Sequence, residues 1–194
     1  MTIHFARRAL LAAAAVLLTA CATGPAPEPH PPIVFVHGNG DTAALWHTLL
    51  WRFESNGWPT QRLHAIDLPY PLARDADDTP QPGRTSTTQH MQFLAAEVEQ
   101  VLRRTGQSRV VLIGNSRGGY AIRNYIANGG GAAKVSHAIL GGVPNHGVWS
   151  NPGFRPNSEF NGAGPFLGAL NRQGGVGIEI TPGVEWLTIR SDNN

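Results

Sequence analysis

Val110-Val111-Leu112-Ile113-Gly114-Asn115-Ser116-Arg117-Gly118-Gly119-Tyr120 limits the architecture of this chain more than any other segment. Residues 109–113, apolar from Val110 onward, predict a short buried strand, and residues 119–125 predict a helix. Between them, residues 114–118 fit the pattern G-x-S-x-G, in which a serine occupies a sharp strand-to-helix turn and exposes its hydroxyl. The flanking glycines keep β-carbons out of that crowded turn. We predict that Ser116 is a nucleophile, the alternative being a glycine-rich loop after a core strand.

A second motif lies upstream, where the apolar run 32–36 ends in His37-Gly38-Asn39-Gly40. Acyl transfer through such a serine needs two backbone N–H groups to hold the oxyanion, one after the nucleophile and one from a loop after an early strand. The backbone of Arg117 would supply the first and that of Asn39 the second. Each donor contributes ~3 kcal/mol in the transition state. His37 is expected to be a structural histidine of the loop rather than a base.

With the ending Thr188-Ile189-Arg190-Ser191-Asp192-Asn193-Asn194, these two motifs resemble the α/β-hydrolase superfamily, and within it the secreted bacterial lipases and esterases. The resemblance covers nearly all of the chain after residue 32. It implies an α/β fold, with a mostly parallel sheet covered by helices on both faces. It also implies hydrolysis of a small-molecule or lipid ester, without cofactor or metal. Because one fold hosts many chemistries, it does not identify the substrate.

The resemblance further implies the chain order serine, acid, histidine for the catalytic triad. Asp192 is the only aspartate after Ser116 and follows an expected strand at 184–189, so it is the predicted acid. The alternative is a solvated aspartate in a polar tail. The remaining acids after the serine are weaker candidates: Glu159, Glu179 and Glu185.

The general base has no counterpart at its expected place, because no histidine follows Asp192. His146 follows an expected strand and could face the active-site side, although as the base it would break the family order. We therefore expect the hydrolase domain, residues 33–194, to be incomplete at its C-terminus and this chain, without the base, to have little activity of its own. His146 is the weak substitute base to test.

The N-terminus predicts export. Two arginines, Arg7 and Arg8, precede an apolar stretch at 9–18. A charged segment followed by a short apolar segment is typical of a secretory signal and is too short to span a membrane. Residues 1–20 are therefore expected to be a signal peptide.

Leu18-Thr19-Ala20-Cys21 resembles a bacterial lipobox, in which the cysteine receives lipid and becomes the new N-terminus. Cys21 would then anchor the protein to a membrane, and Ala22 after it favours the outer membrane. Ordinary cleavage near Ala20 or Ala22, with a periplasmic or secreted product, and a twin-arginine signal are the alternatives. Cys21 is the only cysteine, so the chain has no internal disulfide and no thiol cluster for a metal.

The charge balance gives no indication of a nucleic-acid partner. The chain has 15 Lys and Arg against 13 Asp and Glu, and two of the arginines precede Cys21, so the chain without its leader is balanced. After the leader, the sequence contains no cluster of basic residues that would indicate nucleic-acid binding. Residues 21–32 are rich in Pro and Ala and read as a semi-rigid tether.

The rest of the chain is long enough for one domain with a substantial core, and strands alternate with helices along it, which favours a parallel sheet. The expected strands, beyond the one before Ser116, are 33–36, 61–66, 137–140 and 184–189. Helices are expected near 42–56 and after the capping box Ser86-Thr87-Thr88-Gln89. In that second helix the expected core residues are Met91, Leu94, Val98, Val101 and Leu102.

Residues 144–183 form a Gly-, Asn- and Pro-rich segment with scattered aromatic side chains. So long a segment between strands is uncommon unless it has a function of its own or is disordered. A wall of the substrate pocket and simple surface packing are both compatible with this pattern. The functional alternatives are an inactive binding protein on the same scaffold and another acyl hydrolase, such as an amidase or a polyester depolymerase.

Overall fold

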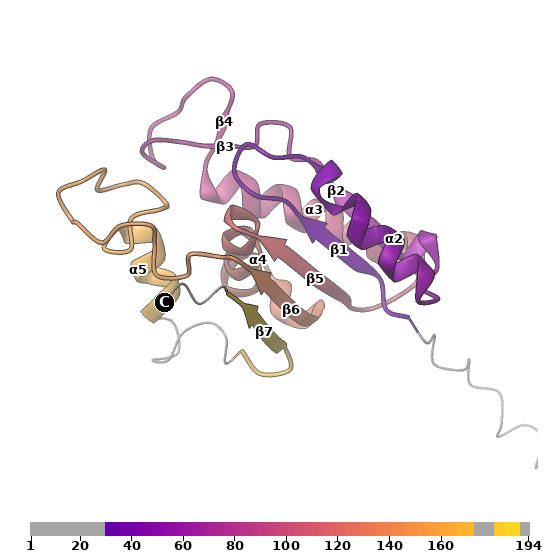
Figure 1. Ribbon diagram of the computed structural model, residues 1–194. Coiled ribbons are helices and arrows are strands. Elements are labelled where there is room, and N and C mark those ends of the chain that lie inside the picture. Colours follow the sequence, from indigo (N-terminus) through magenta and orange to yellow (C-terminus); the bar gives the residue numbers. More distant parts are fainter. Residues whose placement is uncertain (1–29, 173–180, 191–194) are drawn as a thin grey trace, which may run out of the picture.

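Five parallel strands organise the part of the chain that this computed structural model describes, residues 30–172 and 181–190 (Figure 1). Their order across the sheet is β2-β1-β5-β6-β7. The bounds are β1 Ile33–Val36, β2 Leu63–Ile66, β5 Val110–Asn115, β6 Val135–Gly141 and β7 Glu185–Ile189. The predicted parallel sheet is confirmed, and each expected strand is present within a few residues of its expected bounds.

Helices cover both faces of the sheet, as predicted. On one face lies α2 (His47–Ser55), and on the other lie α3 (Thr87–Thr105) and α4 (Arg117–Asn128) (Figure 1). Side chains alternate along β1 because successive residues of a strand point to opposite faces. Phe35 therefore packs in the cluster with α2, whereas Val34 and Val36 pack with α3 and α4.

The helix α3 begins as its sequence predicts. The Ser86 hydroxyl accepts a hydrogen bond from the Gln89 backbone N–H, and the Gln89 side chain accepts one from Ser86 N–H, which completes the capping box. The helix ends at Gly106, which has a left-handed conformation. Of the predicted core residues, Leu94, Val98 and Val101 are fully buried. Met91 and Leu102 are partly buried and pack against the same cluster.

Some short elements were not expected from the sequence. The predicted helix near 42–56 starts with a 3-10 turn, η1 (Ala43–Trp46), before α2. The loop between β2 and α3 contains a two-stranded parallel pair, β3 (Leu72–Ala73) and β4 (Arg84–Thr85), and residues 144–172 contain α5 (Pro165–Arg172). Two further 3-10 turns are η2 (Thr60–Arg62) and η3 (Gly131–Ala133). Such short elements depend on contacts with distant segments, so local patterns predict them poorly.

The glycines of the serine turn allow α4 to approach its neighbours closely. A β-carbon on Gly118 would lie 2.3 Å from the carbonyl oxygen of Val36, and one on Gly119 would lie 2.2 Å from Cγ2 of Val143. Neither position has room for a side chain. These two glycines therefore let the first turn of α4 pack directly on the end of β1 and on the segment after β6.

Residues 1–29, which include the predicted signal peptide and Cys21, lie outside the described residues. Among the helices that are described, none combines the length and the apolar character needed to span a bilayer.

We expect Gly118→Ala to destabilise the protein by about 1–3 kcal/mol, because the added methyl group meets the Val36 carbonyl oxygen, which cannot move without shifting β1. Helix propensity alone predicts the opposite sign, since alanine is the better helix former. Urea unfolding measures the difference. Gly141→Ala is the control, because its β-carbon would meet only Gly114 O at an ordinary 3.8 Å. Equal stabilities of the two variants would contradict the close packing.

Candidate active site

The two sequence motifs meet at the carboxyl edge of the sheet. β1 and β5 are neighbours, with Val36 opposite Gly114, so the loop after β1 lies beside the turn after β5. An ideal β-carbon on Gly38 would lie 3.1 Å from Cβ of Ser116. The structure thus brings the His37-Gly38-Asn39-Gly40 loop against the predicted nucleophile.

Ser116 has the backbone conformation of a strained turn, with φ 49° and ψ −123°. Such a conformation costs energy in any residue with a β-carbon and persists only where its surroundings hold it. Here Ser116 N–H donates to the Gly141 carbonyl at 3.2 Å, and Gly119 N–H donates to the Ser116 carbonyl at 3.0 Å. These bonds attach the turn to the end of β6 and to the first turn of α4.

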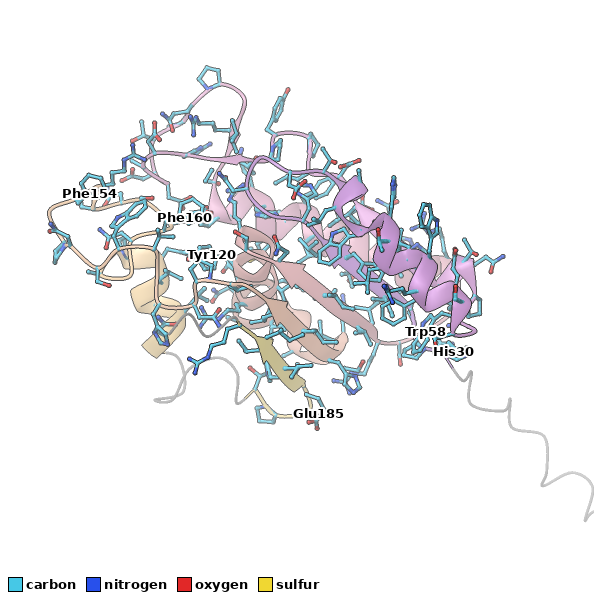
Figure 2. The ribbon with its side chains drawn as sticks, in the orientation of Figure 1. His30, Trp58, Tyr120, Phe154, Phe160 and Glu185 are labelled. Carbon is cyan, nitrogen blue, oxygen red and sulfur yellow. The ribbon has the colours of Figure 1, made fainter. Side chains whose placement is uncertain are left out.

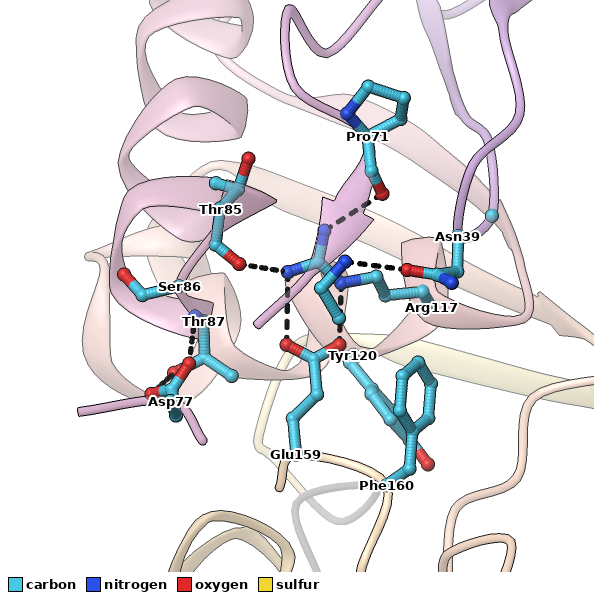
Figure 3. Close-up of polar contacts among 12 residues, drawn as sticks. Asn39, Pro71, Asp77, Thr85, Ser86, Thr87, Arg117, Tyr120, Glu159 and Phe160 are labelled. Atoms are coloured by element: carbon cyan, nitrogen blue, oxygen red, sulfur yellow. Dashed lines mark hydrogen bonds and ion pairs between the residues drawn. The ribbon is translucent and has the colours of Figure 1, made fainter. Parts of the chain in front are cut away.

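One of the two predicted oxyanion donors, Arg117, belongs to this turn, and the other, Asn39, belongs to the loop that packs against it. Arg117 is the first residue of α4, where a backbone N–H has no acceptor within the helix. Asn39 is oriented by its side chain, whose Oδ1 accepts a hydrogen bond from Ala73 N–H at 2.7 Å (Figure 3). Within the described residues, no hydrogen bond occupies the backbone N–H of Asn39 or of Arg117. The helix N-terminus adds positive potential at the same place.

His37 is buried and bound to the backbone of its loop. Its Nε2 accepts a hydrogen bond from Leu68 N–H at 3.1 Å. Its Nδ1 lies 2.9 Å from the Gly38 carbonyl oxygen. The ring therefore joins the loop after β1 to the loop after β2, which is the structural role expected for it.

Asp192 lies outside the described residues, so its role as triad acid stays a prediction. The strand before it is described. β7 ends at Ile189, whose carbonyl accepts a hydrogen bond from Gly142 N–H at 2.9 Å. Two strand spacings, about 10 Å, separate β7 from β5. The chain therefore leaves the sheet for Asp192 at the same edge as Ser116.

His146 is exposed on the loop after β6, and that loop runs along α4 away from the serine. Tyr120 Oη donates to the Pro144 carbonyl at 2.7 Å, and Arg123, one turn further along α4, donates to the Asn145 carbonyl at 3.4 Å. No described interaction joins His146 to Ser116. Its role as substitute base stays a prediction. In the described ranges, no three His, Cys, Asp or Glu side chains group as a metal site would require.

A buried ion pair, absent from the sequence-based predictions, lies directly beside the nucleophile. The Arg117 guanidinium has no exposed surface and forms two bonds with the Glu159 carboxylate, Nε to Oε1 at 2.5 Å and Nη2 to Oε2 at 3.0 Å (Figure 3). Glu159 is 2% exposed. Burial raises the pKa of the Glu159 carboxyl, and the hydrogen bonds and charge of Arg117 oppose that rise. The sequence placed only the Arg117 backbone in the site and ranked Glu159 as a weak acid candidate.

The same contact attaches the segment after β6 to the nucleophile turn. Around Glu159, Asn157 Nδ2 donates to Asp78 and its carbonyl accepts from Asp77 N–H at 2.9 Å, which joins the segment to the loop before α3. On the other side, Phe160 packs on Tyr120 of α4 with ring centroids 5.8 Å apart (Figure 2). The segment is therefore fixed against the active-site edge. In the sequence, the one indication that the segment after β6 is attached here was a charged residue, Arg117, inside the nucleophile turn.

A second buried histidine, His90 on α3, lies near Arg117 and His37. Burial lowers the pKa of His90 well below its usual range, and the nearby charge of Arg117 lowers it further. His90 is therefore neutral in the folded protein.

The serine turn between β5 and α4, backed by the loop after β1, defines the class of α/β proteins with a nucleophile elbow. The comparison with known families agrees. Residues 31–162 match the family model described as alpha/beta hydrolase fold, which is more than half of the chain. The chain belongs to this family.

Individual relatives are more distant. A non-heme haloperoxidase of Rhodococcus erythropolis is 29% identical over 175 residues, which cover 79% of this chain and 57% of that protein. The propeptide form of the Bacillus licheniformis lipase BlEst2 superposes with a TM-score of 0.58 at 22% identity, over 84% of this chain and 36% of that one. The mature form gives 0.56 at 20% identity, over 86% and 68%. This chain thus spans little more than half of the haloperoxidase, and the lipase shares its fold.

We expect the protein to lose stability as the pH falls below about 6.5, the usual pKa of an unfolded histidine. His90 stays neutral when folded but binds a proton when unfolded, so each step down in pH favours unfolding. Between about pH 7.5 and 5.5 this costs up to about 1.4 kcal/mol, the limit set by the pKa of the unfolded histidine. Urea unfolding at both pH values tests it.

His90→Gln should remove this part of the pH dependence. A remainder is expected from His64, whose pKa is also lowered by burial and by Arg104. His137→Gln, at an exposed histidine, is the control and should keep the full slope. An unchanged slope in His90→Gln would contradict the assignment.

Proposed function

We propose that the protein is a serine hydrolase of carboxylic esters, of the lipase and esterase type. One observation supports this most: the strained turn holds Ser116 at the carboxyl edge of the sheet, against the loop that contains Asn39, and no described hydrogen bond uses the backbone N–H of Asn39 or Arg117. A serine hydroxyl beside two such donors suits attack on a carbonyl carbon, because donors of this kind stabilise the oxyanion that forms.

In the proposed reaction, Ser116 Oγ attacks the ester carbonyl carbon while a base removes its proton. The carbonyl oxygen becomes an oxyanion and receives hydrogen bonds from the Asn39 and Arg117 N–H groups. Collapse of the tetrahedral intermediate expels the alcohol, which takes the proton, and leaves an acyl group on Ser116. Water then attacks this acyl-enzyme, releases the acid and regenerates the serine.

The base is a histidine oriented by Asp192 in this proposal. Within the sequence, His146 is the candidate to test. The structural likeness to a lipase supports an ester as the substrate class. The sequence relative is named a haloperoxidase, so the family also includes proteins named for another reaction. An amidase or polyester depolymerase and an inactive binding protein are the rival functions.

In an enzyme that has its general base, Ser116→Ala should reduce hydrolysis of p-nitrophenyl butyrate by several orders of magnitude, since removal of a nucleophile eliminates the acyl-enzyme route. Labelling by a fluorophosphonate should disappear in the same variant. Ser55→Ala, at an exposed serine of α2, is the control and should behave as wild type. Turnover that survives Ser116→Ala would refute the assignment, and wild-type protein that binds esters without turnover would favour the inactive binding protein.

His146→Ala tests the base in the same assay. If His146 removes the serine proton, its loss should lower turnover about as strongly as loss of Ser116, because triad members act as a unit. Unchanged turnover would exclude it. Replacing the ester by the matching anilide distinguishes an esterase, which we expect to prefer the ester, from an amidase.

We also propose that the protein is exported and anchored by lipid on Cys21, with the outer membrane as its location. The support is the sequence before Cys21, which lies outside the described residues. Mass spectrometry of the mature N-terminus should find a diacylglycerol-modified cysteine, and Cys21→Ser should release the protein from the membrane fraction. An unmodified N-terminus at Ala22 would show ordinary signal cleavage instead.

A further inference from the structure

One guanidinium connects three segments around the nucleophile turn. Besides its two bonds to Glu159, Arg117 donates through Nη1 to the Pro71 carbonyl at 3.1 Å and through Nη2 to the Thr85 carbonyl at 2.7 Å (Figure 3). The partners come from the loop after β2, from β4 and from the segment after β6. The side chain therefore determines where these segments lie relative to the first residue of α4.

The Pro71 contact extends the connection to the second oxyanion donor. The Pro71 carbonyl also accepts a hydrogen bond from Gly40 N–H at 3.2 Å. Two residues further, Ala73 N–H donates to Asn39 Oδ1 at 2.7 Å. The loop that bears the Asn39 donor is thus held at Asn39 and at Gly40 by residues 71–73, the segment that Arg117 binds.

Glu159 is the group that keeps the Arg117 side chain in this position. A buried guanidinium needs a counter-charge, because an isolated charge is costly to remove from water. Glu159 is itself held in a tight turn, in which Asn161 N–H donates to the Ser158 carbonyl at 3.1 Å. The Asn161 amide in turn binds the carbonyl of Phe154 at 2.8 Å. A hydrogen-bonded turn of the backbone therefore fixes the position from which the Glu159 carboxylate reaches Arg117.

We infer that Glu159 is a positioning residue for the oxyanion hole. Through the Arg117 side chain, it holds the backbone N–H groups of Arg117 and Asn39 at the separation that a tetrahedral oxyanion on Ser116 requires. This inference rests on the proposed function. It predicts that loss of the ion pair weakens binding of the transition state and leaves binding of the ground state unchanged.

Two ketones separate these states in the full chain. Serine Oγ attacks the carbonyl carbon of an aryl trifluoromethyl ketone, its proton passes to the base, and the carbonyl oxygen becomes a tetrahedral oxyanion. Fluorine NMR measures the dissociation constant of this adduct. The matching methyl ketone binds without adding. The comparison includes wild type, Ser116→Ala and Glu159→Gln. Asp75→Asn is the control, because Asp75 contacts Arg84 and Arg155 at 3.8 Å in an exposed ion pair nearby.

A fourth variant keeps the protein folded without the pair. Arg117→Met combined with Glu159→Leu replaces both charges by apolar side chains of similar size, a change that is often neutral or stabilising for a buried pair. In this variant the backbone N–H of residue 117 remains, but the side-chain hydrogen bonds to the carbonyls of Pro71 and Thr85 are lost. Thermal unfolding reports the stability of each variant.

We expect Glu159→Gln and the double variant to bind the trifluoromethyl ketone about 10- to 100-fold more weakly than wild type, less than the loss of a whole donor. Affinity for the methyl ketone should change by less than about twofold, because the ground state does not use the oxyanion hole. Asp75→Asn should match wild type with both ligands.

Three results would overturn the inference. Equal trifluoromethyl ketone affinity in wild type and the double variant refutes the positioning role and leaves the proposed function standing. Parallel loss of both ketones, as a collapsed site would produce, assigns the pair a structural role only. If wild type forms no adduct that Ser116→Ala abolishes, the proposed function and the positioning role fail together.

Discussion

A positive charge with no exposed surface sits in the first turn of α4, next to the strained serine, and the surrounding chain is arranged to pair it. The Arg117 guanidinium uses the Glu159 carboxylate and two backbone carbonyls from the connection between β2 and α3, that of Pro71 and that of Thr85 in β4. Burying such a pair adds little net stability, since desolvation offsets the attraction. Its effect is to select one arrangement of the loops, because any other arrangement leaves a buried charge unpaired.

The parallel sheet explains why these loops are neighbours at all. Parallel strands place all their carboxyl ends at one edge, and the order β1-β5-β6-β7 sets the loops after them side by side. Close packing then determines the details. Gly118 lets α4 touch the end of β1, and Gly38 lets the upstream loop approach Ser116. Backbone donors can converge on one point only where side chains are absent from the space between them.

Features set by short-range patterns were predictable. The Ser86 capping box starts α3 as expected, and the apolar spacing along that helix identifies its buried face. The serine turn follows from a strand, two glycines and a helix within a dozen residues. By contrast, α5 and the β3–β4 pair escaped prediction, because they are short and their formation depends on contacts with α4 and with the loop after β1.

By itself, the sequence determined the parallel α/β architecture and the place of Ser116 in the turn after β5, since these depend on residue types that a local turn or strand requires. The oxyanion roles of the Asn39 and Arg117 backbone stay predictions. The sequence could not reveal that the Arg117 side chain points inward to Glu159, 42 residues away. Nothing in the polar surroundings of Glu159 distinguishes a buried carboxylate from a solvated one. Only the tertiary structure decides that difference, because burial is produced by segments that meet after the chain has folded.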